Sequence, residues 1–288
     1  MKTRVVQMSD SEFRELRAQI LERAGIAVQE GKRYVLESRL SSRLEALGLD
    51  SFGEYARFLR MSPSRPEEFQ ELLTRVTVNE GCFLRHRHQL ETIERVTLAG
   101  LITARARVRR LRLWSAGCGT GEEAYTLAIM VARALGERRE QWDVEVLGTD
   151  ICLSALERGR SGLYAEPSFR STPASWRASY FVERGGGWAV VPEVRAMVRF
   201  ESHNLLDGLA ARRLGEMDAI LCRDTLIHFD AASRRGAVDV LYERLAPDGA
   251  LYLGPSETLS GADAGFEAMG VDSAHGYVKR PEGVWRAA

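Results

Sequence analysis

Three glycines at alternate positions, followed directly by two carboxylates, are the residues of this sequence best suited to holding a ligand. Gly117, Gly119 and Gly121 follow a short apolar run, and Glu122 and Glu123 precede an amphipathic run. This order is typical of a buried strand, a tight turn and a helix that begins at the turn. Glycine is required where a ligand touches the backbone, because a Cβ leaves it no room. The stretch therefore predicts a pocket for a nucleotide-type ligand.

The two carboxylates discriminate between classes of nucleotide ligand. A phosphate-binding loop would end in Gly-Lys-Ser or Gly-Lys-Thr, whereas this loop ends in Gly121, Glu122 and Glu123. A triphosphate, or the pyrophosphate of a dinucleotide, would lie against like charge here. S-adenosyl-L-methionine has a sulfonium and an ammonium group instead, and Glu123 could pair with the ammonium. The loop therefore favours this cofactor.

A second acidic position supports the same ligand. Residues 144–148 form an apolar run that predicts the next strand, and Asp150 follows its end. A carboxylate at that place can accept hydrogen bonds from both ribose hydroxyls. An ordinary strand-to-helix turn is the alternative for the glycines alone, but glycines, Glu123 and Asp150 together favour the cofactor loop.

The elements that position these residues form an alternating series. Apolar strands at 111–115, 144–148 and 217–222 alternate with helices at 124–135, 154–160 and 233–245, which predicts an α/β fold with a mainly parallel sheet covered on both faces. A turn at 247–249 separates the last helix from strands at 250–254 and 275–279. Ligands bind outside the carboxyl ends of such strands, where Arg223, Asp224 and His228 lie.

Two further regions complete the predicted organisation. Four short helices, the first with Ser9 or Asp10 as its N-cap and ending near Gly25, the others at 31–47, 51–59 and 67–76, predict a helical N-terminal domain over residues 1–76. A connecting segment with a helix at 90–104 occupies 77–110. Prolines and turn glycines interrupt the alternation between about 162 and 199, which predicts a small β insertion within the second domain, 111–288.

Composition limits the possible partners. The chain has 288 residues, of which 40 are basic and 40 acidic, so its formal net charge is zero. No overall field therefore draws it to nucleic acid or to an anionic membrane. No apolar run reaches the roughly 20 residues that span a bilayer, and the N-terminus lacks a signal-peptide core. We expect a cytoplasmic monomer that neither binds nucleic acid nor inserts into a membrane.

Cysteine and histidine spacing gives no indication of a metal site. The four cysteines are widely separated and form no Cys-x-x-Cys motif. The two histidines of the RHRH segment lie two residues apart, on different sides of a helix, and lack a third ligand. We expect neither a disulfide framework nor a bound metal.

Seven segments, in this order, resemble the chemotaxis receptor methyltransferases (CheR-type): GIAVQEGKRYVLESRLSSRLEALGLDSFGEYARFL, VTVNEGCFLR, WSAGCGTGEEAYTLA, LGTDI, HNLL, ILCRDTLIHF and LAPDGALYLGPSE. The resemblance implies an all-α N-terminal domain and a class I S-adenosylmethionine-dependent methyltransferase domain, Rossmann-like, with a mainly parallel seven-stranded sheet and a small β subdomain. It implies a protein-glutamate O-methyltransferase that converts receptor glutamates to methyl esters and releases S-adenosyl-L-homocysteine.

The same resemblance implies roles for single residues. Asn79 and Arg85 reach the cofactor from the inter-domain segment, with Arg85 next to the transferring methyl group. Arg85 and His228 are the expected catalytic residues. The other expected cofactor-binding residues are Gly81, Gly117, Glu123, Asp150 at the ribose, Asn204 with Leu205 beside the adenine, Arg223 and Asp224.

Several positions depart from the pattern of the family. Members usually have Thr at Gly81, an acidic residue at His86, Asn at Asp224 and Tyr at His228. Asp224 introduces a charge that could pair with Arg223. Because these changes cluster on the pocket, we hypothesise as an alternative a weak or inactive homologue that binds S-adenosylmethionine or S-adenosylhomocysteine as a regulatory or sensor module.

The resemblance also implies a docking surface. In the family a basic second helix meets an acidic methylation helix of a chemoreceptor. In this chain Lys32, Arg33, Arg39 and Arg43 remain, whereas Ser42 and Glu45 stand where relatives often add arginine. Fewer charges predict weaker and more salt-sensitive steering of the receptor.

Overall fold

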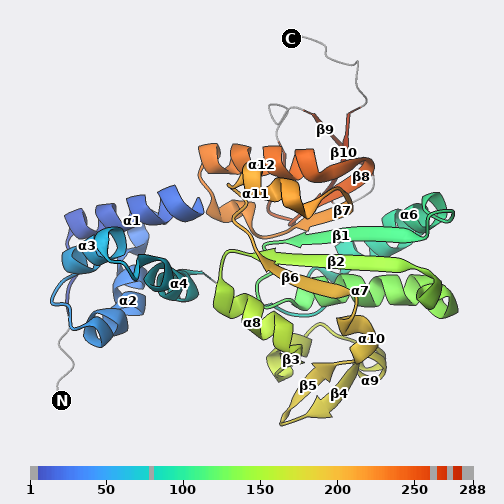
Figure 1. Cartoon of the computed structure of the whole chain (residues 1–288), viewed down its shortest axis with the longest axis horizontal. Helices are drawn as coiled ribbons and strands as arrows, with labels where there is room; N and C mark the ends of the chain where they lie inside the picture. Colours follow the sequence, from blue (N-terminus) through green and yellow to red (C-terminus); the bar gives the residue numbers. More distant parts are fainter. Residues whose placement is uncertain (1–5, 78–80, 260–264, 271–274, 281–288) are drawn as a thin grey trace.

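A computed structural model describes residues 6–77, 81–259, 265–270 and 275–280. Figure 1 shows three parts: a group of helices at the N-terminal end, a central seven-stranded sheet with helices on both faces, and a small sheet beside it. Within the described residues, no helix combines the length and apolar character needed to cross a membrane. The arrangement confirms the fold class predicted from the sequence.

Four α-helices form the N-terminal part, as predicted: α1 (Asp10–Ala24), α2 (Arg33–Leu47), α3 (Phe52–Met61) and α4 (Arg65–Val76), with the short η1 (Glu30–Lys32) before α2. α1 begins at Ser9, whose hydroxyl accepts from the backbone of Glu12 while the Glu12 carboxylate accepts from Ser9 N. It ends at Gly25, which has the left-handed φ of 72°. Their apolar faces enclose a separate core that includes Leu16, Ile20 and Leu40.

A buried carboxylate links three of these helices. Glu68 of α4 is 4% exposed and accepts hydrogen bonds from Tyr55 Oη at 2.8 Å and from Arg43 Nε at 2.9 Å. Burial and the bond to Glu68 raise the pKa of Tyr55 well above its ordinary value. Arg43 is therefore committed to the interior of the helical part, although the sequence places it on the basic face of the second helix.

The connecting segment is helical from α5 (Arg87–Thr92) through η2 (Ile93–Leu98) to α6 (Ala99–Ala104). The helix predicted at 90–104 thus begins three residues earlier, and its middle is a π-helical stretch that periodicity does not reveal. Within that stretch, the Thr97 hydroxyl is hydrogen-bonded to the phenol of Tyr252 in the central sheet.

The central sheet has the order β6-β2-β1-β7-β8-β10-β9. Its first five strands in that order are parallel, and β10 is antiparallel to both neighbours. The strands are β1 (Arg110–Ala116), β2 (Asp143–Asp150), β6 (Val198–Ser202), β7 (Met217–Cys222), β8 (Leu245–Leu253), β9 (Phe266–Ala268) and β10 (Gly276–Lys279). The order reverses between β1 and β7, so both strands point their carboxyl ends at a crevice suited to a ligand.

Both faces of the sheet are covered by helices. One face carries α7 (Glu122–Leu135) and α8 (Leu153–Ser161), and the other carries α11 (Gly208–Ala211) and α12 (Ala231–Arg244) (Figure 1). Successive side chains of β1 point to opposite faces, so Leu113 joins one apolar core and Trp114 the other. A strand that is apolar on both faces must lie in the middle of the sheet.

The predicted β insertion is an antiparallel sheet of order β3-β5-β4, made of β3 (Leu163–Tyr164), β4 (Phe181–Arg184) and β5 (Gly187–Val190). Short helices surround it: η4 (Glu166–Phe169), α9 (Ala174–Tyr180) and α10 (Pro192–Arg195). The remaining single turns are η3 (Gly136–Gln141), η5 (Arg212–Leu214) and η6 (Leu226–His228).

The turn predicted at Pro247–Gly249 is wrong. These residues lie within β8, where the pairing with β7 jumps from Met217 opposite Leu245 to Ala219 opposite Ala250. The intervening residues bulge out, and Asp248 at the bulge pairs with Arg105. Proline and glycine close together indicate irregular backbone. Whether the chain reverses there or continues as a bulged strand depends on pairing with the neighbouring strand.

Removing the cation beside Glu68 tests the interior of the helical part. We expect Arg43→Met to lower the free energy of unfolding by about 3 kcal/mol, because it leaves a buried carboxylate with only the Tyr55 hydroxyl. Urea unfolding followed by circular dichroism measures the change. Arg57→Met on the exposed face of α3 is the control, with an expected change below about 0.5 kcal/mol. Equal effects of the two substitutions would contradict this role of Arg43.

Candidate functional site

Two cavities meet at the glycine loop. The larger, of about 520 Å³, lies between the helical part and the carboxyl ends of the strands, and its size suits a small-molecule ligand. The smaller, of about 140 Å³, lies on the other side of the loop, under the connecting segment. Gly117, Gly119 and Asp224 line both cavities, so an extended ligand can pass from one to the other along these residues.

Two positions of the glycine loop, Gly117 and Gly121, leave no room for a side chain. Gly117 has a φ of 77°, and a Cβ there would lie 2.3 Å from Oγ1 of Thr225. Gly121 has a φ of 92°, and its Cβ would lie 2.7 Å from the ring of Phe200. Left-handed backbone and close neighbours therefore both require glycine, as the sequence indicates for the turn.

Asp150 fixes the loop from the end of β2. One of its carboxylate oxygens accepts Gly119 N at 2.9 Å and the other accepts Cys152 N at 2.9 Å. Asp150 also lines the larger cavity, and a carboxylate has about four acceptor positions, so it can accept a hydrogen bond from a ligand there as well. Burial raises the pKa of Asp150, and the backbone N–H groups oppose that shift.

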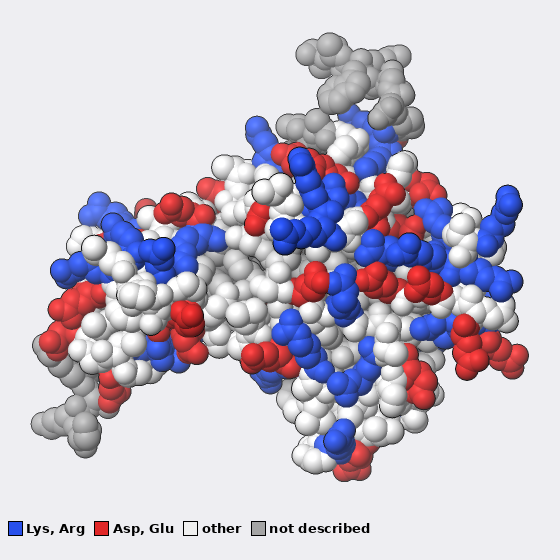
Figure 2. Space-filling view, in the orientation of Figure 1, with Lys and Arg blue, Asp and Glu red and all other residues white. Residues whose placement is uncertain are grey.

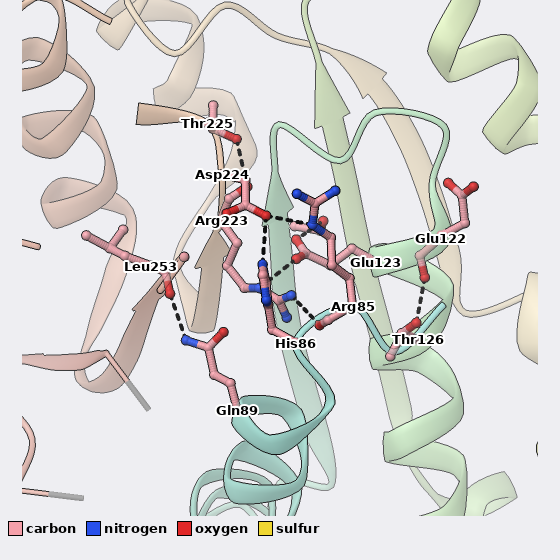
Figure 3. A network of polar contacts seen from close by, with 12 residues as sticks. Arg85, His86, Gln89, Glu122, Glu123, Thr126, Arg223, Asp224, Thr225 and Leu253 are labelled. Carbon is pink, nitrogen blue, oxygen red and sulfur yellow. Dashed lines mark hydrogen bonds and ion pairs between the residues drawn. The ribbon is translucent and has the colours of Figure 1, made fainter. Parts of the chain in front are cut away.

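Glu123 lies on the wall of the smaller cavity and is held from two sides. Ser115 Oγ donates to its carboxylate at 2.7 Å, and Arg223 Nε lies 3.3 Å from it. Burial raises the pKa of Glu123, and the Arg223 guanidinium opposes the shift. The Arg223 side chain is 2% exposed and donates to the carbonyl of Arg85 (Figure 3).

Asp224 contacts two side chains of the connecting segment (Figure 3). Arg85 Nε lies 2.7 Å and His86 Nε2 lies 3.0 Å from the same carboxylate oxygen, Oδ2. The predicted pairing of Asp224 with Arg223 is therefore wrong, because Arg223 points to Glu123 instead. The Arg85 side chain is 44% exposed, so the guanidinium is accessible from outside while it is held at the cavity.

Three residues at the contact between Arg85 and Asp224 have left-handed backbone conformations. Leu84, His86 and Asp224 have φ values of 57°, 55° and 55°, in a region that residues with a Cβ rarely adopt. Such strain persists only where the surroundings hold the chain, and it concentrates at functional sites. Arg85 lies between two of these left-handed residues, Leu84 and His86, and its side chain points to Asp224.

Glu122 occupies the space beside Gly81. Its carboxylate accepts hydrogen bonds from Thr120 Oγ1 at 2.6 Å and Ser168 Oγ at 2.9 Å, and the residue is 3% exposed. A Cβ on Gly81 would lie 2.4 Å from Glu122 Oε2. Of the two carboxylates after the glycine turn, Glu122 joins the loop to η4 beside the small sheet, whereas Glu123 contacts Ser115 and Arg223.

The remaining predicted residues lie on the larger cavity. Asn204 donates to Arg23 O at 2.8 Å and accepts Leu206 N at 3.0 Å, and Leu205 beside it is 6% exposed. His228 lines this cavity, and its carbonyl accepts Ala27 N at 2.7 Å. The structure thus separates His228 from the smaller cavity of Arg85. Asn79 lies outside the described residues.

Sequence reasoning missed two residues that hold the site. Glu257 is fully buried and accepts three backbone N–H groups, one of them from Asp224. Gln89 is 4% exposed and donates to Leu253 O at 2.7 Å (Figure 3). The signal for Glu257 was an acidic residue three positions after the glycine that ends an apolar strand, within LGPSE.

A double-mutant cycle tests the contact of Gly81 with Glu122. We expect Gly81→Ala to destabilise the protein by about 2 kcal/mol, because the new methyl group displaces a carboxylate that is buried and hydrogen-bonded. In a Glu122→Ala background the same substitution should cost at least about 1 kcal/mol less. Urea unfolding measures all four proteins, and Gly100→Ala, in open space on α6, is the control. The same cost in both backgrounds would refute the contact.

Comparisons with known proteins agree with this geometry. A family model described as "CheR methyltransferase, SAM binding domain" matches residues 79–275, and one described as "CheR methyltransferase, all-alpha domain" matches residues 11–77. The chain is 33% identical over 279 residues to chemotaxis protein methyltransferase 2 of Vibrio cholerae, covering 96% of each chain. It is 34% identical to the chemotaxis protein methyltransferase of Salmonella typhimurium, covering 93% of this chain and 91% of that one. With both family models matched in sequence order, the chain belongs to the CheR methyltransferase family.

Proposed function

We propose that this protein transfers a methyl group from S-adenosyl-L-methionine to glutamate side chains of chemoreceptor-like signalling proteins and forms glutamate methyl esters. The observation that carries the proposal is the position of Arg85, which lies at the smaller cavity beside Glu123 and Asp224 and is open to the outside. A carboxylate substrate can reach this guanidinium without entering the protein. We further propose that it acts in the cytoplasm as a monomer.

The residues of the two cavities fit the parts of the cofactor. The carboxylate of Asp150, which lines the larger cavity, suits a ribose diol, and the carboxylate of Glu123 suits an ammonium group. Arg223 is a buried cation whose Nη1 has no hydrogen-bond partner among the described residues, and it suits a ligand carboxylate. Asn204 and Leu205 would flank the adenine, and Gly117 would lie against the bound ligand.

The proposed chemistry needs little from the protein beyond placement. The bound cofactor supplies an electrophilic methyl group, and a glutamate carboxylate is already a competent nucleophile, so no strong base is required. Arg85 orients the incoming carboxylate, while Asp224, which also contacts His86, holds Arg85 at the cavity. Alignment and exclusion of water account for most of the acceleration in such a transfer.

The pairing of Arg85 supports a second candidate function. Asp224 already occupies the Nε edge of Arg85, so a substrate carboxylate meets both a cation and a like charge there. Such a site can bind the cofactor or its product while transferring methyl groups slowly. The alternative is therefore a regulatory module that senses S-adenosylmethionine or S-adenosylhomocysteine and acts on a partner.

The docking of a receptor helix on α2 relies on few free charges. Arg43 is bound to Glu68, and Arg39 donates to the carbonyls at the end of α4. Arg33 pairs with Asp10, and Lys32 lines the larger cavity. Figure 2 shows acidic and basic side chains interspersed over the visible face of the helical part. Steering of an acidic receptor helix should therefore be weak and strongly reduced by salt.

Methyl transfer to receptor-containing membranes tests the proposal directly. With radiolabelled cofactor we expect base-labile label on the receptor, and a 10- to 100-fold lower kcat/KM in Arg85→Ala, because a hydrogen bond to a charged group contributes about 1.5–3 kcal/mol. Arg87→Ala is the control, since Arg87 pairs with Glu91 on the exposed side of α5 and should leave transfer unchanged.

Calorimetry with S-adenosylhomocysteine separates the two candidate functions. Saturable binding that Asp150→Ala abolishes, together with methyl transfer, supports the enzyme. The same binding without transfer to any receptor supports the sensor. Absence of saturable binding would refute both.

The raised pKa of Glu123 predicts a proton linkage. In the free protein burial holds this pKa above its ordinary value of 4.5. Pairing with the ligand ammonium lowers it, so binding releases protons, and affinity for S-adenosylhomocysteine should rise with pH through the raised pKa and then level off. Calorimetry in two buffers of different ionisation enthalpy measures the release. We expect Glu123→Gln to reduce it, and an undiminished release in that variant would contradict the assignment.

A further inference from the structure

The carboxylate of Glu257 lies where two neighbouring strands separate. β7 and β8 pair as far as Cys222 opposite Leu253, and beyond this pair the chains diverge. Gly254 follows Leu253 directly and Asp224 follows Cys222 by two residues, so the N–H groups of both lie beyond the ladder. Glu257 Oε2 accepts both of them, at 2.8 Å each. The carboxylate therefore takes the place of the strand neighbour that each N–H lacks.

A third bond extends this anchor along the loop after β7. Glu257 Oε1 accepts Ile227 N at 3.0 Å, and the residue is 0% exposed. A Cβ on Gly254 would lie 2.8 Å from Glu257 Oε2 and 2.8 Å from Asp224 N, so only glycine leaves room for the anchor. A fully buried carboxyl group that accepts three backbone donors is a specific arrangement, because each oxygen fits a fixed N–H group.

The opposite side of the gap is closed by Gln89. Its Nε2 donates to Leu253 O at 2.7 Å, so the last carbonyl of β8 is also satisfied by a side chain. Gln89 belongs to α5 and follows Arg85 and His86 closely in the sequence. Figure 3 shows it below these residues. The strand divergence is thus filled by two polar side chains from different parts of the chain.

The anchored loop contributes to both cavities. It begins with Arg223, which meets Glu123 and the Arg85 carbonyl, and continues with Asp224, which meets the Arg85 side chain. Asp224 has a left-handed backbone, which a residue with a Cβ keeps only where surrounding bonds impose it. The bond from Asp224 N to Glu257 is one of those bonds.

We propose that Glu257 is a positioning residue for the methyl-transfer site: through three backbone hydrogen bonds it sets the places of Arg223 and Asp224, and through them the orientation of Arg85. The effect of Glu257 on catalysis rests on the proposed function. Its effect on the position of the loop does not depend on that function. Glu257 lines neither of the two cavities, and its carboxylate accepts hydrogen bonds from the loop after β7 and from Gly254.

Glu257→Gln tests the anchor with little change of shape. The amide keeps one acceptor oxygen but directs an NH2 group at a backbone N–H, so at least one of the three donors loses its acceptor. We expect the amide of Asp224 or Ile227 to exchange with deuterium at least tenfold faster in NMR measurements, with the amides of β1 and β2 unchanged. Glu267→Gln on the exposed side of β9 is the matched control and should leave every one of these rates unaltered.

Kinetics separate positioning from a purely structural role. We expect Glu257→Gln to lower kcat at least tenfold per site that binds S-adenosylhomocysteine, with the KM for S-adenosylmethionine changed less than threefold. A purely structural role would reduce the number of binding sites and leave kcat per site unchanged, and that result would overturn the proposal. Unchanged exchange at all three amides would also overturn it.

Amide exchange still tests the anchor if the variant does not fold or if the proposed function is wrong. If Glu257→Gln does not fold, the wild-type protein decides: the amides of Asp224, Ile227 and Gly254 should exchange as slowly as those of the central ladder, and exchange at the rate of exposed loops would overturn the anchor. If the wild-type protein binds S-adenosylhomocysteine but transfers no methyl group, the proposed enzyme fails, and the kinetic part of the proposal falls with it, while the exchange rates still decide the anchor.

Discussion

The shape of both cavities depends on one kind of interaction. At the carboxyl edge of the sheet, side-chain carboxylates accept hydrogen bonds from backbone N–H groups. Asp150 accepts Gly119 N and Cys152 N beside β2, and Glu257 accepts three N–H groups between β7 and β8. Loops that leave a parallel sheet carry donors without a strand partner, and a buried donor left unsatisfied costs about 1–3 kcal/mol. A carboxyl oxygen that accepts the N–H group removes that cost and fixes the loop. The ligand-binding shape of this edge follows from those fixed loops.

The side chains that face the smaller cavity have polar partners on distant elements. Glu123 at the start of α7 meets Arg223 after β7, and Asp224 meets Arg85 and His86 of the connecting segment. Each pair limits the motion of both partners, and low dielectric strengthens the pairing. Arg85 is the most accessible member, which leaves it suited to meet a substrate carboxylate. This arrangement fits a reaction in which orientation contributes more than acid or base strength.

The helical part is also a wall of the larger cavity. Ala27 N donates to His228 O at 2.7 Å, Asn204 Nδ2 donates to Arg23 O at 2.8 Å, and Leu153 N donates to Gln70 Oε1 at 3.0 Å. These contacts join α1 and α4 to the loops after β6, β7 and β2. A ligand in the cavity touches both parts, so its binding stabilises their packing by mass action.

The sequence alone determined the alternation of strands and helices, the glycine turn and the class of cofactor, because periodicity and backbone constraints are properties of short stretches of chain. It also placed Glu123 after the glycine turn and Asp150 at the end of a strand. The tertiary structure decided the partners: Asp224 pairs with Arg85 and His86 rather than with Arg223, and the Pro247–Gly249 signal became a bulge. It also revealed Glu257, whose contact with Asp224 joins residues 33 positions apart. Such contacts depend on how the sheet brings distant loops together, and no local pattern encodes that meeting.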